Sequence, residues 1–128
     1  MLIPQLASFE DVAVLCLRIV LAVVFVTSGW SHLTRPAERG ESIGLSQGTT
    51  ALLGAVEVVG GGLVALGILP QVGGLLLAGV MLGAIYKKLL VWGTGFWGER
   101  NDGWYYDLLY LVGLLVVVTS GGGALTFS

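Results

Sequence analysis

The stretch 51–69, ALLGAVEVVGGGLVALGIL, constrains the fold of this chain more than any other. It is long and apolar enough to cross a lipid bilayer, because a helix of ~20 apolar residues spans the ~30 Å hydrocarbon core. One carboxylate, Glu57, lies well inside this apolar run. A carboxylate in a membrane costs roughly 2.5–3.5 kcal/mol on insertion scales, so it normally faces a partner, water or a ligand. The other helices must therefore place a partner residue, a water-accessible space or a ligand site beside Glu57.

The composition extends the membrane argument to the whole chain. Its 128 residues are 55% hydrophobic and 11% charged, with a mean hydropathy of +0.91, whereas soluble domains carry about 25% charged residues. A net charge of -2 without a basic patch gives no reason to expect a nucleic-acid partner. The single cysteine, Cys16, cannot form an internal disulfide, which counts against a membrane thiol–disulfide oxidoreductase. We therefore expect an all-α integral-membrane protein.

Four apolar runs predict four membrane spans within one transmembrane domain, 1–128. The spans cover residues 12–33, 49–69, 71–92 and 104–120, and polar loops occupy 34–48 and 93–103. Pro70 is expected to open the third helix at its first position, and the glycines at 121–123 to end the fourth. Short connections between the spans give an antiparallel four-helix bundle whose backbone hydrogen bonds are satisfied within the helices. Both chain termini then lie on one side.

The charges and aromatic residues are distributed asymmetrically along this bundle. Apart from Arg18, every lysine and arginine belongs to the loop end. The positive-inside rule therefore places both loops in the cytoplasm and both termini outside a bacterial or archaeal inner membrane. All four tryptophans and all four tyrosines also belong to the loop end. They indicate either a one-sided interfacial anchor or an aromatic-lined pocket or docking surface.

Small residues mark the expected helix-packing positions. Three of them, Gly54, Gly60 and Gly61, surround Glu57 at helical spacing. Gly79 and Gly83 form a GxxxG pattern that lets helix backbones approach closely. We expect this pattern to pack within the bundle, with a dimer interface as the alternative.

Depth along the helices predicts which ionisable residues meet. At ~1.5 Å per residue, Glu57 lies about 12 Å from the loop-side surface, Lys87 about 7 Å and Asp107 about 5 Å. Lys87, helped by Asp107, is therefore the expected partner of Glu57. Arg18 lies about 22 Å from that surface and would have to reach Glu57 at a slant.

Two further ionisable residues belong to the loop end. His32 is expected at the solvated rim, and Lys88 is expected to extend its ammonium group to the interface. The candidates for a buried polar network or quinone site are Arg18, His32, Glu57, Lys87, Trp104, Asp107 and Tyr110. In a structural role they would fix helix register. In a quinone site, Lys87, His32, Trp104 and Tyr110 would donate hydrogen bonds, while Glu57 and Asp107 would relay protons.

No catalytic motif, phosphate loop or cofactor fingerprint accompanies these candidates. One histidine, one cysteine and scattered acids lack the spacing of a metal site. Neither a metal nor a covalent cofactor is therefore expected. Quinone and lipid are the candidate ligands.

Three segments resemble the DoxX family of small four-span membrane proteins: LRIVLAVVFVTSGWSHL (17–33), EVVGGGLVALGIL (57–69) and DGWYYDLLYLVGLLVV (102–117). Arg18, Gly29 and His32 occupy the arginine, glycine and lysine places of the family pattern LxRLxxGxxFxxxGxxKL. Glu57 matches the acidic residue that opens the second span. Asp107 stands where the family usually has glutamate, and His32 is likewise a departure.

The resemblance implies association with membrane redox systems, since one branch of the family is the DoxD-type subunit of thiosulfate:quinone oxidoreductase. The first expectation is an accessory subunit of a larger membrane redox or energy-converting complex, without catalytic activity of its own and packed against other membrane subunits. A quinone-interacting oxidoreductase subunit with a site around Glu57 is the first alternative. A protein that binds lipid or a small hydrophobic molecule is the second.

Overall fold

The structure is a computed structural model that describes residues 2–98 and 103–127. It confirms the all-α membrane bundle. In chain order the helices are η1 (Pro4–Phe9), α1 (Glu10–Thr34), α2 (Pro36–Ile43), α3 (Gln47–Leu66), α4 (Pro70–Tyr86), η2 (Lys87–Val91) and α5 (Tyr105–Ser120). By length and composition, three helical stretches can cross a membrane: Pro4–Thr34, Gln47–Leu66 and Pro70–Val91. The fourth, α5, has 16 residues and is ~24 Å long, so it is the shortest, as predicted.

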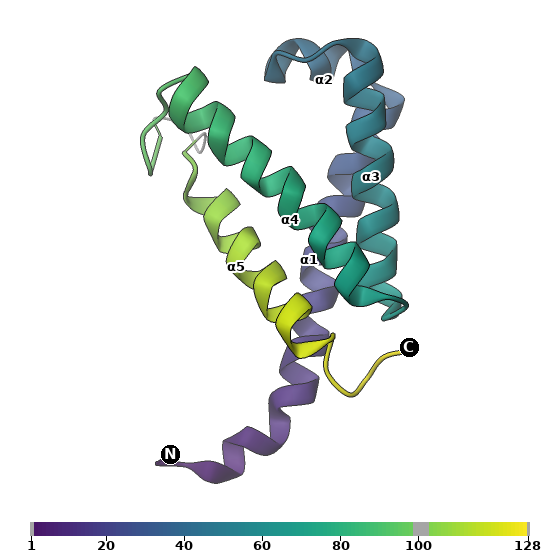
Figure 1. Cartoon of the computed structure of the whole chain (residues 1–128), viewed down its shortest axis with the longest axis vertical. Helices are drawn as coiled ribbons and strands as arrows, with labels where there is room; N and C mark the ends of the chain where they lie inside the picture. The colour runs from purple at the N-terminus through teal and green to yellow at the C-terminus, as the bar shows by residue number, and fades with distance from the viewer. Residues whose placement is uncertain (1, 99–102, 128) are drawn as a thin grey trace.

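The bundle consists of two helix pairs that diverge toward one end (Figure 1). Helix α1 packs along α3, and α4 packs along α5. Helix α4 crosses α3 near the end where both termini lie, and the two pairs separate toward the opposite end, beside α2. The buried core, where the four long helices meet, consists of Leu21, Phe25, Val64, Leu77, Ala78, Met81, Leu114 and Val117.

Local sequence signals explain where the helices begin and end. Ser46 caps α3 by accepting a hydrogen bond from the Thr49 backbone N–H at 3.2 Å. Gly67 ends α3 at φ 69°, in the left-handed region that favours glycine. Pro70 is the first residue of α4, and α5 ends at Ser120 before Gly121, as the sequence predicts.

Two segments differ from their predicted form. The loop 34–48 is not irregular throughout, because Pro36 opens the eight-residue helix α2 and Gly44 ends it at φ 72°. The third span does not stay α-helical to its end. From Lys87 it is π-helical, and the Trp92 N–H donates to the Lys87 carbonyl at 2.8 Å. Residues 99–102 of the second predicted loop lie outside the described residues.

Glycines set the distance between α1 and α3. A methyl group on Gly29 would lie 2.7 Å from the Gly54 carbonyl oxygen, and one on Gly54 would lie 2.6 Å from the Gly29 carbonyl oxygen. The two backbones therefore touch at this crossing, which only glycine permits. Gly61 faces Val26 of α1, and Gly60 faces Leu77 of α4, each with no room for a larger side chain.

The predicted packing of Gly79 and Gly83 within the bundle is wrong. Among the described residues, no atom outside their own helix neighbourhood lies within 4 Å of a methyl group built on either glycine. Both are exposed on α4. Because the two helix pairs diverge, this part of α4 does not pack against α3.

Candidate functional site

A cavity of about 840 Å³ lies between the two helix pairs at the diverging end. Its walls are mostly apolar, with aromatic side chains from Phe25, Tyr86, Trp92, Tyr106 and Tyr110. Five charged side chains also line it: Arg39, Glu57, Lys87, Lys88 and Asp107. Pockets for small molecules typically have volumes of ~300–1,000 Å³ and apolar walls with a few polar groups. The cavity therefore has the size and lining of a ligand site.

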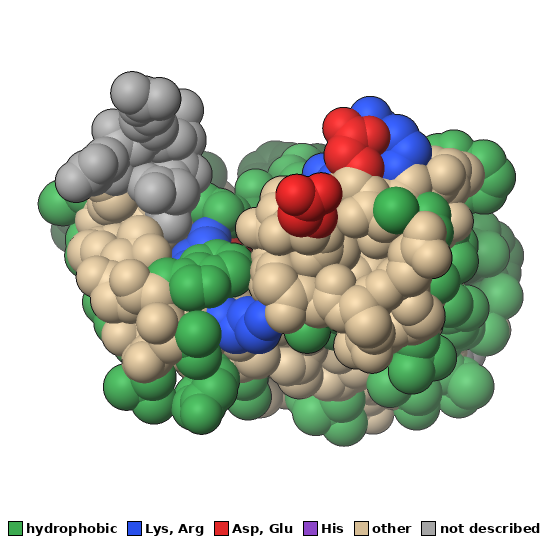
Figure 2. Space-filling view, turned by 90° about the horizontal axis from the view of Figure 1, so that it is seen from above, with side chains coloured by type: hydrophobic (Ala, Val, Ile, Leu, Met, Phe, Trp, Pro, Cys, Tyr) green, Lys and Arg blue, Asp and Glu red, His purple; other side chains and the backbone are tan. Residues whose placement is uncertain are grey.

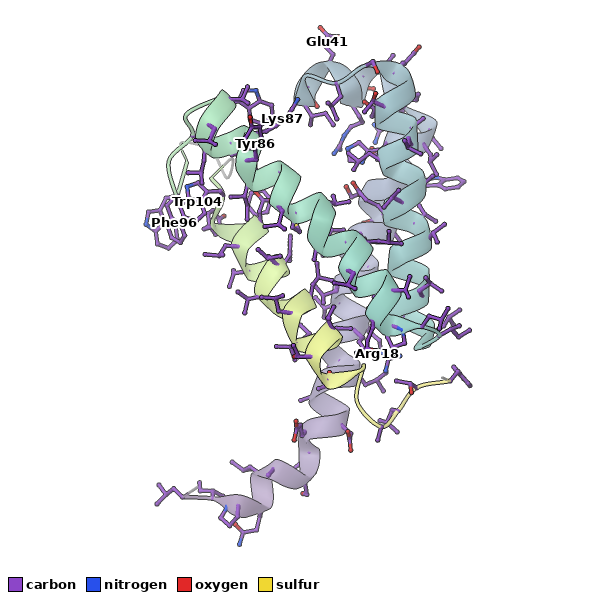
Figure 3. The ribbon with its side chains drawn as sticks, viewed as in Figure 1. Arg18, Glu41, Tyr86, Lys87, Phe96 and Trp104 are labelled. Atoms are coloured by element: carbon purple, nitrogen blue, oxygen red, sulfur yellow. The ribbon has the colours of Figure 1, made fainter. Side chains whose placement is uncertain are left out.

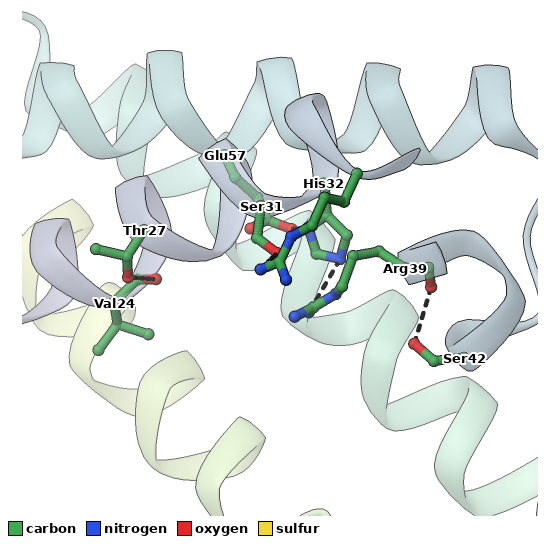
Figure 4. Close-up of polar contacts among 8 residues, drawn as sticks. Val24, Thr27, Ser31, His32, Arg39, Ser42 and Glu57 are labelled. Carbon is green, nitrogen blue, oxygen red and sulfur yellow. Dashed lines mark hydrogen bonds and ion pairs between the residues drawn. The ribbon is translucent and has the colours of Figure 1, made fainter. Parts of the chain in front are cut away.

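The first polar cluster of this site joins α1 to α3. His32 Nδ1 lies 3.3 Å from Glu57 Oε1, and the exposed fractions of the two residues are only 4% and 3%. Arg39 of α2 places its guanidinium 3.3 Å from His32 Nε2 (Figure 4). The second carboxylate oxygen, Glu57 Oε2, is buried and has no hydrogen-bond partner among the described residues. Glu57 lines the cavity, so a rotation of its side chain would present this acceptor oxygen to a bound molecule.

The prediction that Lys87 pairs with Glu57 is therefore wrong, as is the prediction of a solvated His32. The depth of a residue in the membrane does not determine the direction in which its side chain points about the helix axis. His32 follows Gly29 by three residues, and Glu57 follows Gly54 by three residues, so each acid–base partner shares a face with the glycine of the crossing. The backbone contact between those glycines brings the two side chains together.

The second polar cluster joins the end of α4 to α5. Lys88 Nζ lies 2.8 Å from Asp107 Oδ2, and both residues are buried. The ammonium group also contacts the Tyr106 hydroxyl and lies 3.8 Å from the centroid of the Tyr106 ring. Lys88 thus does not extend to the interface, contrary to expectation. The π-helical turn, which begins one residue earlier, alters the angular spacing on which that expectation relied.

Lys87 lies at the mouth of the cavity and points toward α2 (Figure 3). Its Nζ donates to the Ile43 carbonyl at 2.8 Å and to the Gly44 carbonyl at 3.1 Å. A cation is favoured there because the last carbonyls of a helix carry partial negative charge. Lys87 therefore connects η2 to the end of α2 across the mouth.

Arg18 lies at the opposite end of the bundle and takes no part in the cavity (Figure 3). Its exposed fraction is 1%. The guanidinium donates to four carbonyls that follow or end helices α3 and α5: Val64 at 2.9 Å, Ala65 at 3.2 Å, Gly122 at 3.2 Å and Leu125 at 2.6 Å. Arg18 thus fastens the C-terminal tail to the α3–α4 turn rather than reaching Glu57.

The remaining sequence candidates divide between the cavity and its outside. Tyr110 lines the wall. Trp104 instead packs on Phe96, with ring centroids 4.8 Å apart, at the outer edge of the molecule (Figure 3). The structure adds three residues that sequence reasoning missed as site members, Arg39, Lys88 and Tyr106. The described part of the chain brings no three potential metal ligands together.

Fold, hydropathy and cavity together define a helical integral-membrane protein with a ligand-sized space between its helix pairs. The family model DoxX matches residues 13–91, and the chain belongs to the DoxX family. An uncharacterized membrane protein of Mycobacterium tuberculosis is 34% identical over 135 residues, which cover 94% of this chain and 82% of that protein. No solved structure matches the chain. The matched region contains His32, Glu57 and Lys88 but ends before Asp107.

Proposed function

We propose that this protein binds a membrane-soluble molecule of the quinone class in the cavity, as a subunit of a membrane redox system. The observation that carries the proposal is the buried Oε2 of Glu57, an acceptor without a hydrogen-bond partner among the described residues, in the wall of an apolar space of about 840 Å³. The hydroxyl of a reduced quinone would donate to this oxygen. The aromatic walls provide surfaces against which a ring packs.

The two polar clusters favour a neutral ligand in the inner part of the cavity, which we define as the part lined by Glu57 and Asp107. His32 contacts Glu57 on one wall, and Lys88 forms an ion pair with Asp107 on the other. A charged head group would disturb one of these pairs, whereas a quinone ring presents oxygen atoms without net charge. The redox role comes from the family resemblance alone.

Equilibrium binding in detergent tests the proposal. A short-tailed benzoquinol and its quinone are titrated while tryptophan fluorescence is followed, since Trp92 lies in the cavity wall. Hydrogen bonds to charged groups are worth ~1.5–3 kcal/mol, so Glu57→Gln should weaken quinol binding by roughly tenfold or more. The matched control is Glu41→Gln, which changes an exposed carboxylate on the outer side of α2 (Figure 3).

Two results would contradict the quinone proposal. The first is equal affinity for the quinol and for an alkylbenzene of the same size that lacks oxygen. The second is equal binding by the Glu57→Gln and Glu41→Gln variants. Either result would mean that the cavity binds hydrophobic molecules without recognising the oxygen atoms of a quinone.

A second candidate function is that of an accessory subunit in a larger membrane complex. The uncovered surface of α4 at Gly79 and Gly83 favours it. Gly79 and Gly83 are exposed and touch no other helix in the described structure, which leaves room for a helix of another membrane subunit. Gly79→Leu and Gly83→Leu should then abolish co-purification with that subunit in mild detergent. Gly62→Leu is the matched control, because Gly62 on α3 is equally free of described neighbours. A wild-type chain that purifies without a stoichiometric partner would exclude this role.

A further inference from the structure

The charged side chains around the cavity carry an excess of positive charge. Its lining contains three cations, Arg39, Lys87 and Lys88, against two carboxylates, Glu57 and Asp107. With all five ionised the lining is positive by one charge, whereas the whole chain carries -2. Viewed from above, basic side chains lie in the hollow between the two lobes, and the outer surface carries acidic side chains with further basic ones beside them (Figure 2). The hollow therefore attracts anions.

The unbalanced positive charge lies at the cavity mouth, which we define by Arg39, Ile43, Leu45, Tyr86, Lys87 and Trp92. Lys88 lies deeper and is paired with Asp107. Neither Arg39 nor Lys87 forms an ion pair in the described part of the chain. Arg39 contacts the His32 ring, and its Nε is buried without a hydrogen-bond partner among those residues. Arg39 thus holds an unused donor at the mouth.

An apolar track leads from the mouth along α4. It consists of Tyr86, Gly83, Gly79 and Leu76, all of which line the cavity and are exposed. Ten residues separate its ends, so it is ~15 Å long. The two glycines have no described neighbour within 4 Å. The track is therefore an uncovered apolar strip of the cavity wall, against which an acyl chain can pack.

We propose that the mouth binds the phosphate of an anionic phospholipid from the surrounding bilayer, with one acyl chain along the α4 track. Guanidinium and ammonium groups are the side chains that bind phosphate oxygens best. The apolar track favours a lipid over free phosphate. The excess positive charge favours an anionic over a zwitterionic lipid, and Tyr86 and Trp92 suit the level of the head groups. The mouth and the inner quinone site are parts of one cavity, and Arg39 contacts His32 of the inner cluster, but the lipid proposal does not depend on quinone binding.

Native mass spectrometry of the intact chain tests the proposal. The protein is released from nanodiscs that contain equal amounts of phosphatidylglycerol and phosphatidylcholine, and the retained lipids are counted. We expect one phosphatidylglycerol per chain to be retained. Each basic residue near a lipid surface contributes about fivefold in affinity, so the double variant Arg39→Gln/Lys87→Gln should bind roughly thirtyfold more weakly.

Matched variants separate this site from general surface charge. Arg35→Gln removes an exposed arginine at the same end whose side chain, among the described residues, hydrogen-bonds to Ser31, and should leave retention unchanged. Since Lys87 also holds the end of α2, Arg39→Gln alone serves as the variant that preserves this contact, with an expected loss of about fivefold. Circular dichroism verifies the helical fold of each variant.

Four results would overturn the proposal. They are equal retention of the two lipids by the wild type, an equal loss in Arg35→Gln, displacement of the lipid by millimolar inorganic phosphate, and preferential retention of a fatty acid. Quinol binding is measured on the same samples. Glu57→Gln, which should weaken quinol binding, should keep the phosphatidylglycerol, so failure of the lipid site and failure of the quinone site are distinguishable.

Discussion

The contact between Gly29 and Gly54 makes the strongest stability prediction, because it positions the His32–Glu57 pair. Gly54→Ala adds one methyl group at the crossing of α1 and α3. That methyl would lie 2.6 Å from the Gly29 carbonyl oxygen, 2.9 Å from the Leu33 backbone nitrogen and 2.9 Å from His32 Cβ. Two of these three atoms belong to the backbone of α1. No side-chain rotation relieves the overlap, so the helices must separate.

The size of the effect follows from these distances. Ordinary contact begins at 3.4 Å, so the Gly29 oxygen must retreat by about 0.8 Å from 2.6 Å. Overpacking of this kind typically costs 1–3 kcal/mol, and the better helix propensity of alanine offsets up to ~1 kcal/mol. We expect a net loss of about 1–2 kcal/mol. The same displacement would lengthen the His32–Glu57 contact from 3.3 Å to beyond hydrogen-bonding distance.

Unfolding by a denaturing detergent in mixed micelles, followed by circular dichroism, measures this loss. Gly62→Ala is the matched control, because a methyl group there meets no described atom within 4 Å. It should leave stability unchanged or raise it slightly. Quinol affinity should fall in Gly54→Ala and not in Gly62→Ala. Equal stability of the two variants would refute the claim that the helices touch at Gly54.

Three further predictions concern residues away from this crossing. Asp107→Asn leaves the buried ammonium of Lys88 without its carboxylate, so it should destabilise the fold by about 3–5 kcal/mol in the same unfolding assay. The double variant Asp107→Leu/Lys88→Met removes both charges and should recover most of that loss. Arg18→Leu removes the donor shared by four carbonyls, so the C-terminal tail should become the first site cut in limited proteolysis. The helix content measured by circular dichroism should stay near the wild-type value. Ser46→Ala removes the N-cap of α3 and should cost about 1 kcal/mol by detergent-induced unfolding, and Ser42→Ala, on the exposed surface of α2, should cost less.

The helices of this fold were predictable because their signals are local. Apolar runs of membrane length predict α1, α3 and α4, and Pro70 and Gly121 mark helix ends that the structure confirms. The π-helical turn was not predictable, since no residue in 87–91 signals an i→i+5 hydrogen bond. The same holds for α2, because a proline followed by charged and glycine residues is as typical of a polar loop as of a short helix.

The site was predictable in composition but not in pairing. Glu57, Lys87, Asp107 and Tyr110 do line one cavity, as their positions near the loop end suggest. Pairing depends on the rotation of each helix about its own axis, and a depth estimate contains no such information. The spacing of three residues between Gly54 and Glu57 was the available signal, because the bare glycine indicates which face of α3 meets another backbone. Arg39 was missed because its helix was assigned to an irregular loop.

The pairing found in the structure has a consequence for how the cavity works. His32–Glu57 lies within the α1–α3 pair, and Lys88–Asp107 lies within the α4–α5 pair. No ion pair among the described residues crosses the cavity from one helix pair to the other. Each helix pair therefore holds its own buried polar contact, and at this end Lys87 connects the two pairs through the carbonyls at the end of α2. Among the described residues, the side-chain hydrogen bonds that span the gap at this end are the two of Lys87, so the spacing between the two pairs can adjust to a bound molecule without breaking a buried ion pair. Divergent helix pairs of this kind favour ligands that contact both walls at once.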